Sequence, residues 1–233
     1  MERPRAAKKR NSYRPSEYIA FEVVSEKDYL NECKKGRKPT RGNNCTSIDA
    51  LIYAEDESGK KYIFPIEWKY TEYYDNGDKS IEDSNKKSQN HKKGDEAKGT
   101  ERLDRYSNLI TKSTQLKDNK QLNLERGNYK NSVYFFEPFY QLMRQTLWVE
   151  QMTKIENHKN EELNAIDYIH IHVIPKENDS LLDKIYPCSK KKMKTTWNSC
   201  LKNEKTHRII SPEEFLNSIN DAYLRNYLET RYW

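Results

Sequence analysis

The sequence predicts a single α/β domain in which helices flank a mixed central sheet. Strand-like segments come first along the chain, and helical segments with one further strand follow them, which favours this class. The length of 233 residues gives room for one large core. A hydrophobic fraction of 34% and an aromatic fraction of 12% exclude a fully disordered chain.

Three strands are expected early in the chain. Residues 18–24 are rich in β-branched and aromatic side chains, as strands are. The apolar runs 46–54 and 62–70 flank a polar, glycine-containing turn at residues 55–60. This pattern predicts a hairpin with a loop longer than the minimal two residues.

The later elements are mainly helical. We expect a helix at residues 101–112, a strand at 167–174, and a helix from Ser211 to the end of the chain, opened by the capping box Ser-Pro-Glu-Glu. The last helix should bury Phe215, Leu216, Ile219, Tyr223 and Leu228. Another helix, beginning near Pro138, should bury one face made of Phe139, Leu142, Met143, Leu147 and Met152.

The domain should span residues 1–233, with a basic N-terminal tail at 1–14 and a flexible polar insertion at 75–100. The net charge of +6 is concentrated in that tail and in residues 184–208, where eight basic residues stand against one acid. Such blocks suit a polyanion such as nucleic acid, although solvated lysine-rich segments would have the same composition.

No apolar stretch is long enough to cross a membrane, and the N-terminus lacks the apolar core of a secretory signal. The four cysteines form no Cys-x-x-Cys pair, which argues against a zinc knuckle or ribbon. Without a secretory signal, they are expected to be reduced thiols of a cytoplasmic protein.

The candidate catalytic residues lie on the two strands of the predicted hairpin. If its loop is centred on Ser58, paired residues have numbers that sum to 116, so Asp49 lies opposite Glu67. Lys69 shares their face because strand side chains alternate. The other face should then form the core, with Ile48, Ala50, Ile52, Phe64, Ile66 and Trp68.

Two facing carboxylates repel each other unless a cation lies between them. Oxygen ligands favour Mg²⁺ or Mn²⁺, which would polarise a phosphoryl oxygen and lower the pKa of a bound water. Lys69 would orient or deprotonate the attacking water and stabilise developing negative charge. A surface salt bridge between Lys69 and the two acids is the structural alternative, and Pro65 leaves the register open to a bulge.

This arrangement resembles the PD-(D/E)XK superfamily of phosphodiesterases, which has the restriction-endonuclease-like fold. It is most similar to a group of restriction-endonuclease-like proteins with an IEVKYTE-type motif after a Thr-x-x-Asp strand. The matching segments here are Thr46–Asp49 and Ile66–Glu72. The group also has a Gln-x-x-Arg helix, matched by Gln141–Arg144, and a later strand followed by Pro and Asn, matched by Pro175 and Asn178.

The resemblance implies that Asp49 and Glu67 bind the metal together with the main-chain carbonyl of Trp68, and that Lys69 is the catalytic lysine. The resemblance also implies that Gln141 and Arg144 orient the site or contact a phosphate of the nucleic acid, and that Glu72 is an accessory residue; ordinary solvent-facing helix residues are the alternative for Gln141 and Arg144. The superfamily places a helix, often with a metal-binding acid, before the first strand. Only 17 residues precede Tyr18 here, so the expectation is either a chain shortened at its start or a substitution of that acid by Glu17 or Glu22.

Three other groups are candidates. His170 and His172 point to one strand face, as in two-histidine metal sites or a polar sheet face. Cys188, Cys200 and His207 match no zinc-site spacing. Lys190, Lys191 and Lys192, with Tyr186 and Trp197 nearby, suggest a surface that binds the DNA backbone and stacks on bases, or else an exposed loop.

The sequence therefore predicts a metal-dependent endonuclease that hydrolyses DNA, with RNA as the other open substrate and a homodimer as one open assembly. The alternative is a catalytically inactive nucleic-acid-binding protein, or a subunit of a defence or repair complex, with the same fold.

Overall fold

The computed structural model describes residues 18–34, 36–41, 45–75, 77–81, 98–118, 129–161, 163–217 and 222–232. Within these residues, six strands form one mixed sheet in the order β1-β2-β3-β5-β6, with β4 paired to β3. β1 to β3 are antiparallel, whereas β4 and β5 run parallel to β3 and β6 runs parallel to β5. The strands are β1 (Tyr18–Val23), β2 (Ile48–Glu55), β3 (Lys61–Trp68), β4 (Asp167–Tyr168), β5 (His170–Val173) and β6 (His207–Ile210).

The predicted hairpin register is confirmed. The residue numbers of every recorded β2–β3 pair sum to 116, from Ala50 with Ile66 to Glu55 with Lys61. Pro65 causes no bulge and pairs with Leu51. It lies on β3 between the segment paired with β4 and the segment paired with β5, where the partner strand changes.

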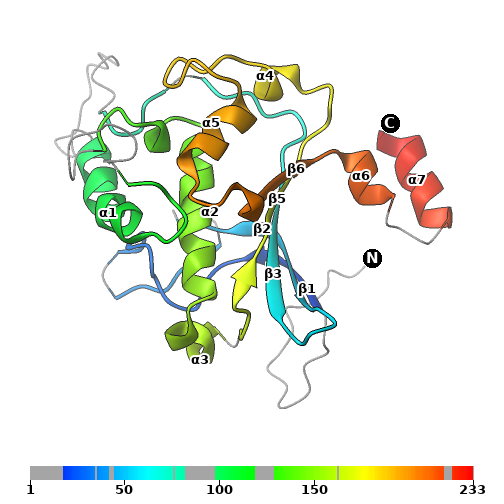
Figure 1. Ribbon diagram of the computed structural model, residues 1–233, viewed down its shortest axis with the longest axis horizontal. Helices are drawn as coiled ribbons and strands as arrows, with labels where there is room; N and C mark the ends of the chain where they lie inside the picture. Colours follow the sequence, from blue (N-terminus) through cyan, green and yellow to red (C-terminus); the bar gives the residue numbers. More distant parts are fainter. Residues whose placement is uncertain are drawn as a thin grey trace.

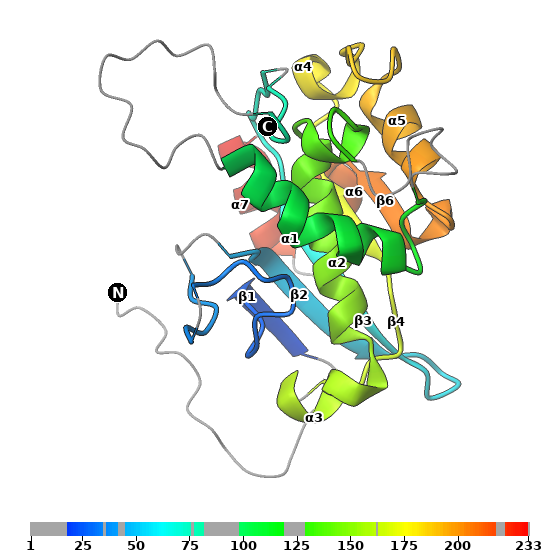
Figure 2. The ribbon, with the colours of Figure 1, turned by 90° about the vertical axis from the view of Figure 1, so that its left-hand side faces the viewer.

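Helices lie on both sides of the sheet (Figure 1). α2 crosses one face, while α6 and α7 lie on the other side, and α1 lies beside α2 (Figure 2). The predicted α/β class is therefore confirmed. The helices are α1 (Lys98–Lys112), α2 (Phe139–Met152), α3 (His158–Glu161), α4 (Asp179–Leu182), α5 (Met193–Cys200), α6 (Pro212–Leu216) and α7 (Ala222–Tyr232), with 3₁₀ turns at Val133–Phe135, Ile155–Asn157 and Glu204–Thr206.

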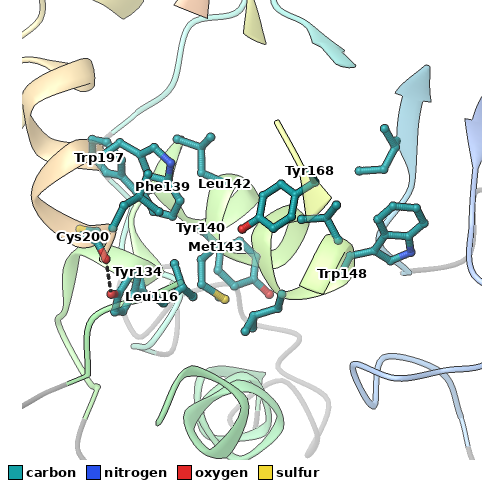
Figure 3. Close-up of a cluster of buried hydrophobic side chains, with 14 of the residues drawn as sticks. Leu116, Tyr134, Phe139, Tyr140, Leu142, Met143, Trp148, Tyr168, Trp197 and Cys200 are labelled. Carbon is teal, nitrogen blue, oxygen red and sulfur yellow. Dashed lines mark hydrogen bonds between the residues drawn. The ribbon is translucent and has the colours of Figure 1, made fainter. Parts of the chain in front are cut away.

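The core gathers around α2, because that helix is apolar on most of its surface and is buried by its neighbours. All five of the residues predicted to form its buried face are buried. Figure 3 shows Phe139 beside Trp197 of α5, and the two rings are stacked with centroids 6.5 Å apart. The hydroxyl of Tyr134 donates to the carbonyl of Cys200 at 3.2 Å, which ties the loop before α2 to α5 (Figure 3).

The prediction of which sheet face forms the core was only partly right: Ile48 and Ile66 of that face are buried, and Ile48 belongs to the main core, but the other four residues are not buried. The main core includes Leu51, Tyr53 and Ile63, which share a face with Asp49 and Glu67. The face with Ala50, Ile52, Phe64 and Trp68 is only half-buried, and Trp68 contacts Phe215 of α6. Both faces of this hairpin are apolar, so alternation alone could not show which one α2 would cover.

The C-terminal prediction is confirmed only at its start. Ser211 and Glu214 form the expected capping box, but α6 ends at Leu216 and a separate helix, α7, begins at Ala222. Tyr223 was expected to be buried and is 83% exposed. Ile219 and the side chain of Leu228 lie outside the described residues.

The tail at 1–14 and residues 82–97 of the predicted insertion also lie outside the described residues. The two ends of that insertion are placed in the fold. Asp78 pairs with Phe136 in an isolated bridge, and Lys98–Thr100 form the first turn of α1. Gly99 permits this packing, because a Cβ at this position would lie 2.7 Å from the carbonyl oxygen of Ser80.

Candidate active site

The hairpin brings the predicted acids together at one end of β2 and β3. One step beyond the last recorded pair, the same register sets Asp49 across from Glu67. Asp49 accepts a hydrogen bond through Oδ2 from the backbone N–H of Trp68 at 2.9 Å, which holds its carboxylate against the end of β3. The backbone N–H of Lys69 then donates to Val173 on β5, so pairing with that strand continues past the end of β3.

Glu67 is buried, and both of its carboxylate oxygens accept hydrogen bonds. Its Oε1 accepts from Lys69 Nζ at 2.7 Å and from Gln141 Nε2 at 2.8 Å, and its Oε2 accepts from Gln145 Nε2 at 2.6 Å. Gln141 and Gln145 are one turn apart on α2, so the helix that forms the core also holds the carboxylate. Gln141 was predicted from the sequence and Gln145 was not, although a second glutamine four residues further along lies on the same helical face.

Lys69 is buried beside Glu67, with Glu72 and Tyr74 around it. Its Nζ lies 4.0 Å from Glu72 Oε1, and Tyr74 donates from its hydroxyl to Gln141 Oε1 at 3.2 Å. The other carboxylate oxygen of Glu72 is buried without a hydrogen-bond partner in the described part of the chain. A buried lysine in contact with one glutamate and near a second fits a site more closely than an exposed surface salt bridge does.

The charges at this site shift one another's pKa. Burial raises the pKa of Glu67, and the charge of Asp49 adds to that rise while Lys69 opposes it. Burial alone would lower the pKa of Lys69, but its contact with the carboxylate of Glu67 outweighs that and raises it. Lys69 is therefore held as an ammonium ion in this arrangement.

Arg144 and Glu22 are not at this centre. Arg144 donates from Nε to Glu32 at 2.8 Å, in a buried cluster where Glu32 also accepts from Tyr106 and Thr46. Glu22 lies on the edge strand β1 and pairs with Arg41 at 2.8 Å. Glu32 was not predicted from the sequence. Its partners lie 14 to 112 residues further along the chain, so no local spacing of residues indicates its role.

The lysine loop is exposed, which both of its interpretations require. Lys190, Lys191 and Lys192 lie between α4 and α5, and Lys192 pairs with Asp183 at 2.7 Å. Tyr186 and Trp197 are buried, so the prediction that they stack on bases was wrong. They belong to the core that packs on α2.

His170 and His172 are buried beside His207, with ring centroids 4.5 to 5.8 Å apart. In the described residues, no three His, Cys, Asp or Glu side chains are arranged to hold a metal ion. This excludes, for the described residues, the zinc site considered for Cys188, Cys200 and His207. Among the same residues, no third acid joins Asp49 and Glu67 in a group that could hold a metal ion.

The comparison with known protein families shows to which family this chain belongs. A family described as "Restriction Endonuclease associating with ARP" matches residues 4–233. The chain belongs to this family. Searches of curated proteins and of solved structures give no match.

Membership of the restriction-endonuclease family accounts for the six-stranded mixed sheet flanked by helices, and it indicates a nuclease that acts on nucleic acid. The expected resemblance to restriction-endonuclease-like proteins is thereby confirmed. No helix among the described residues is long and apolar enough to cross a membrane.

Proposed function

We propose that the chain is a metal-dependent nuclease of the PD-(D/E)XK type that hydrolyses phosphodiester bonds of DNA. The observation that carries this proposal is the buried ion pair of Glu67 with Lys69 beside Asp49, on two paired strands of a restriction-endonuclease family member. Burying Glu67 and Lys69 at one strand end, with Asp49 half-buried beside them, disfavours folding, and such arrangements are common at catalytic sites.

The residues present fit a hard divalent cation. Asp49 and Glu67 offer carboxylate oxygens, and the charge of Asp49 acts on Glu67, so a cation would relieve their repulsion. Both carboxylates and the main-chain carbonyl of Trp68 would hold Mg²⁺ or Mn²⁺. Such an ion supplies Lewis-acid polarisation of a phosphoryl oxygen and lowers the pKa of a water.

Lys69 would act mainly through its charge. Because the carboxylate of Glu67 raises the pKa of Lys69, its ammonium group suits stabilising the negative charge that develops on the phosphate and orienting the attacking water. Gln141 and Gln145 would keep Glu67 ionised and fixed by donating to both of its oxygens. Lys190, Lys191 and Lys192 would contribute exposed charge toward the nucleic-acid backbone.

The test is cleavage of supercoiled plasmid, single-stranded DNA and single-stranded RNA with Mg²⁺, Mn²⁺ or EDTA. Asp49→Asn keeps an acceptor for the Trp68 N–H, and Lys69→Met keeps the side-chain length. Each should reduce cleavage by at least about 100-fold. Asp56→Asn, at the exposed turn of the same hairpin, is the matched control and should cleave like the wild type. Cleavage that survives both site variants would contradict the proposed site.

A second candidate is a catalytically inactive nucleic-acid-binding protein, or a subunit of a defence or repair complex. Two observations favour it: both oxygens of Glu67 already accept hydrogen bonds, and no third acid completes a metal site among the described residues. The family description also names an association with ARP. Salt-sensitive DNA binding without cleavage under any metal would support this candidate.

A further inference from the structure

A pocket of about 510 Å³ lies beside α2, on the side where α1 packs. Twelve residues line it. They belong to α1, to α2, and to the segment between β1 and β2, and the other two are Lys79 and Glu137. Its volume is within the range of sites that hold small ligands or parts of larger ones. Neither the hairpin acids nor Lys69 line it, so it is a separate site.

The lining is strongly basic. Three glutamates face six basic residues, which gives a formal excess of three positive charges, and the basic residues are Lys34, Lys79, Lys98, Arg102, Arg105 and Arg144. Two of the glutamates are already used in ion pairs, Glu32 with Arg144 at 2.8 Å and Glu101 with Arg105 at 2.6 Å. The third, Glu137, has one carboxylate oxygen buried without a hydrogen-bond partner in the described part of the chain.

Two of the arginines contact aromatic rings before any ligand arrives, and Arg144 is also held by the buried Glu32. The guanidinium of Arg144 lies 5.5 Å from the ring centre of Tyr140, and that of Arg105 lies 5.9 Å from the ring centre of Tyr106. Both rings also line the pocket. Guanidinium groups held by aromatic rings and glutamates lose little conformational freedom on binding, and their planar N–H donors match the oxygens of a phosphate.

The pocket adjoins the candidate active site through α2. Arg144 follows Gln141, which donates to Glu67, by three residues, so the two side chains are neighbours on one helical face. Glu137 lines the pocket and is close enough to Lys69 for their charges to interact. A nucleic-acid strand bound at Asp49 and Glu67 would therefore have this basic pocket beside the neighbouring part of α2.

We propose that this pocket binds a phosphate group of the nucleic acid, apart from the phosphate that is cleaved. The identity of the ligand rests on the proposed nuclease function, whereas the charge and shape of the pocket do not. The phosphate belongs either to the end of a strand or to its interior, and these two sources are separable by experiment.

The experiment measures binding in EDTA, so that no cleavage occurs. Fluorescence anisotropy would follow a short single-stranded DNA with a 5′-phosphate, the same DNA with a 5′-hydroxyl, and competition by circular single-stranded DNA. The double variant Lys34→Gln/Lys79→Gln removes two charges from the pocket. The control Lys154→Gln/Lys159→Gln removes two exposed charges beyond the far end of α2.

The pocket variant should bind about tenfold more weakly, and the slope of log K against log salt should become smaller by about 1. The control should remain within about twofold of the wild type. A preference for the 5′-phosphate that the pocket variant loses assigns the site to strand ends. Equal binding of both oligonucleotides, with weaker binding of each by the pocket variant, assigns it to an internal phosphate.

Equal losses in the pocket variant and the control would overturn the proposal, while metal-dependent cleavage would leave the nuclease function intact. If the wild type neither binds nor cleaves nucleic acid, titration calorimetry with inorganic pyrophosphate decides. Pyrophosphate binding by the wild type that the pocket variant loses would support the pocket without the nuclease function. No pyrophosphate binding by the wild type in that case would overturn it.

Discussion

Two glutamate–arginine pairs in this protein have nearly the same geometry and opposite surroundings. Arg144 contacts Glu32 at 2.8 Å, and the side chain of Glu32 is 3% exposed. Arg105 contacts Glu101 at 2.6 Å, and the side chain of Glu101 is 62% exposed. Because water screens the second pair, the shorter contact should be the weaker one.

Glu32→Gln should therefore lower the free energy of unfolding by about 3 kcal/mol, since it leaves the buried Arg144 without its counter-charge. Glu101→Gln should lower it by less than about 0.5 kcal/mol. Urea denaturation of both variants at pH 7 measures the difference. Equal losses would show that Glu32 is not held in the buried cluster described above.

At the scale of elements, α2 joins the core to the candidate active site. One side of the helix buries the apolar residues that hold it on the sheet, and Gln141 and Gln145 reach Glu67 from the same helix. Any loosening of α2 would move both amides away from the carboxylate. The precision of the site therefore depends on the packing of residues that take no part in its chemistry.

Gln141→Leu and Gln145→Leu should each reduce metal-dependent cleavage about 10- to 100-fold, because Glu67 loses a donor that orients its carboxylate. Gln151→Leu on the same helix is the matched control, since Gln151 contacts Lys154 and not the site. Cleavage rates at saturating and limiting Mg²⁺ separate weaker metal binding from a slower reaction. Similar rates for all three variants would mean that the amides do not position Glu67.

At the scale of the whole molecule, local patterns predicted the hairpin and α2 but not the contacts between distant segments. The register of β2 and β3 follows from one turn, so Asp49 and Glu67 could be paired from the sequence. The role of Glu32 could not be predicted, because its partner Arg144 lies 112 residues further along the chain. β6 and α5 were missed for a related reason: short segments are defined mainly by what they pack against.

The same limit applies to the three histidines of β5 and β6. His170 and His172 alternate along β5, which suggested a polar face, but β6 adds His207 and the sheet buries all three. His172 Nδ1 lies 3.2 Å from His207 Nε2, and both ring nitrogens of His170 lack hydrogen-bond partners in the described part of the chain. Burial lowers the pKa of all three, that of His207 to about 3.

This cluster should make the fold sensitive to acid. Between the unfolded pKa of about 6.5 and the lower folded values, the unfolded chain binds more protons, so the stability present above pH 6.5 is lost as the pH falls. Each histidine contributes about 1.4 kcal/mol per pH unit, or about 4 kcal/mol per pH unit for the three together. Urea denaturation from pH 7 to pH 5 should show this slope, and His170→Leu should reduce it by about one third. Because leucine needs no hydrogen bond, that variant should also be at least as stable as the wild type at pH 5. A free energy of unfolding that stays constant from pH 7 to pH 5 would contradict the burial of the histidines. It would then also contradict the burial of the sheet face that carries Glu67.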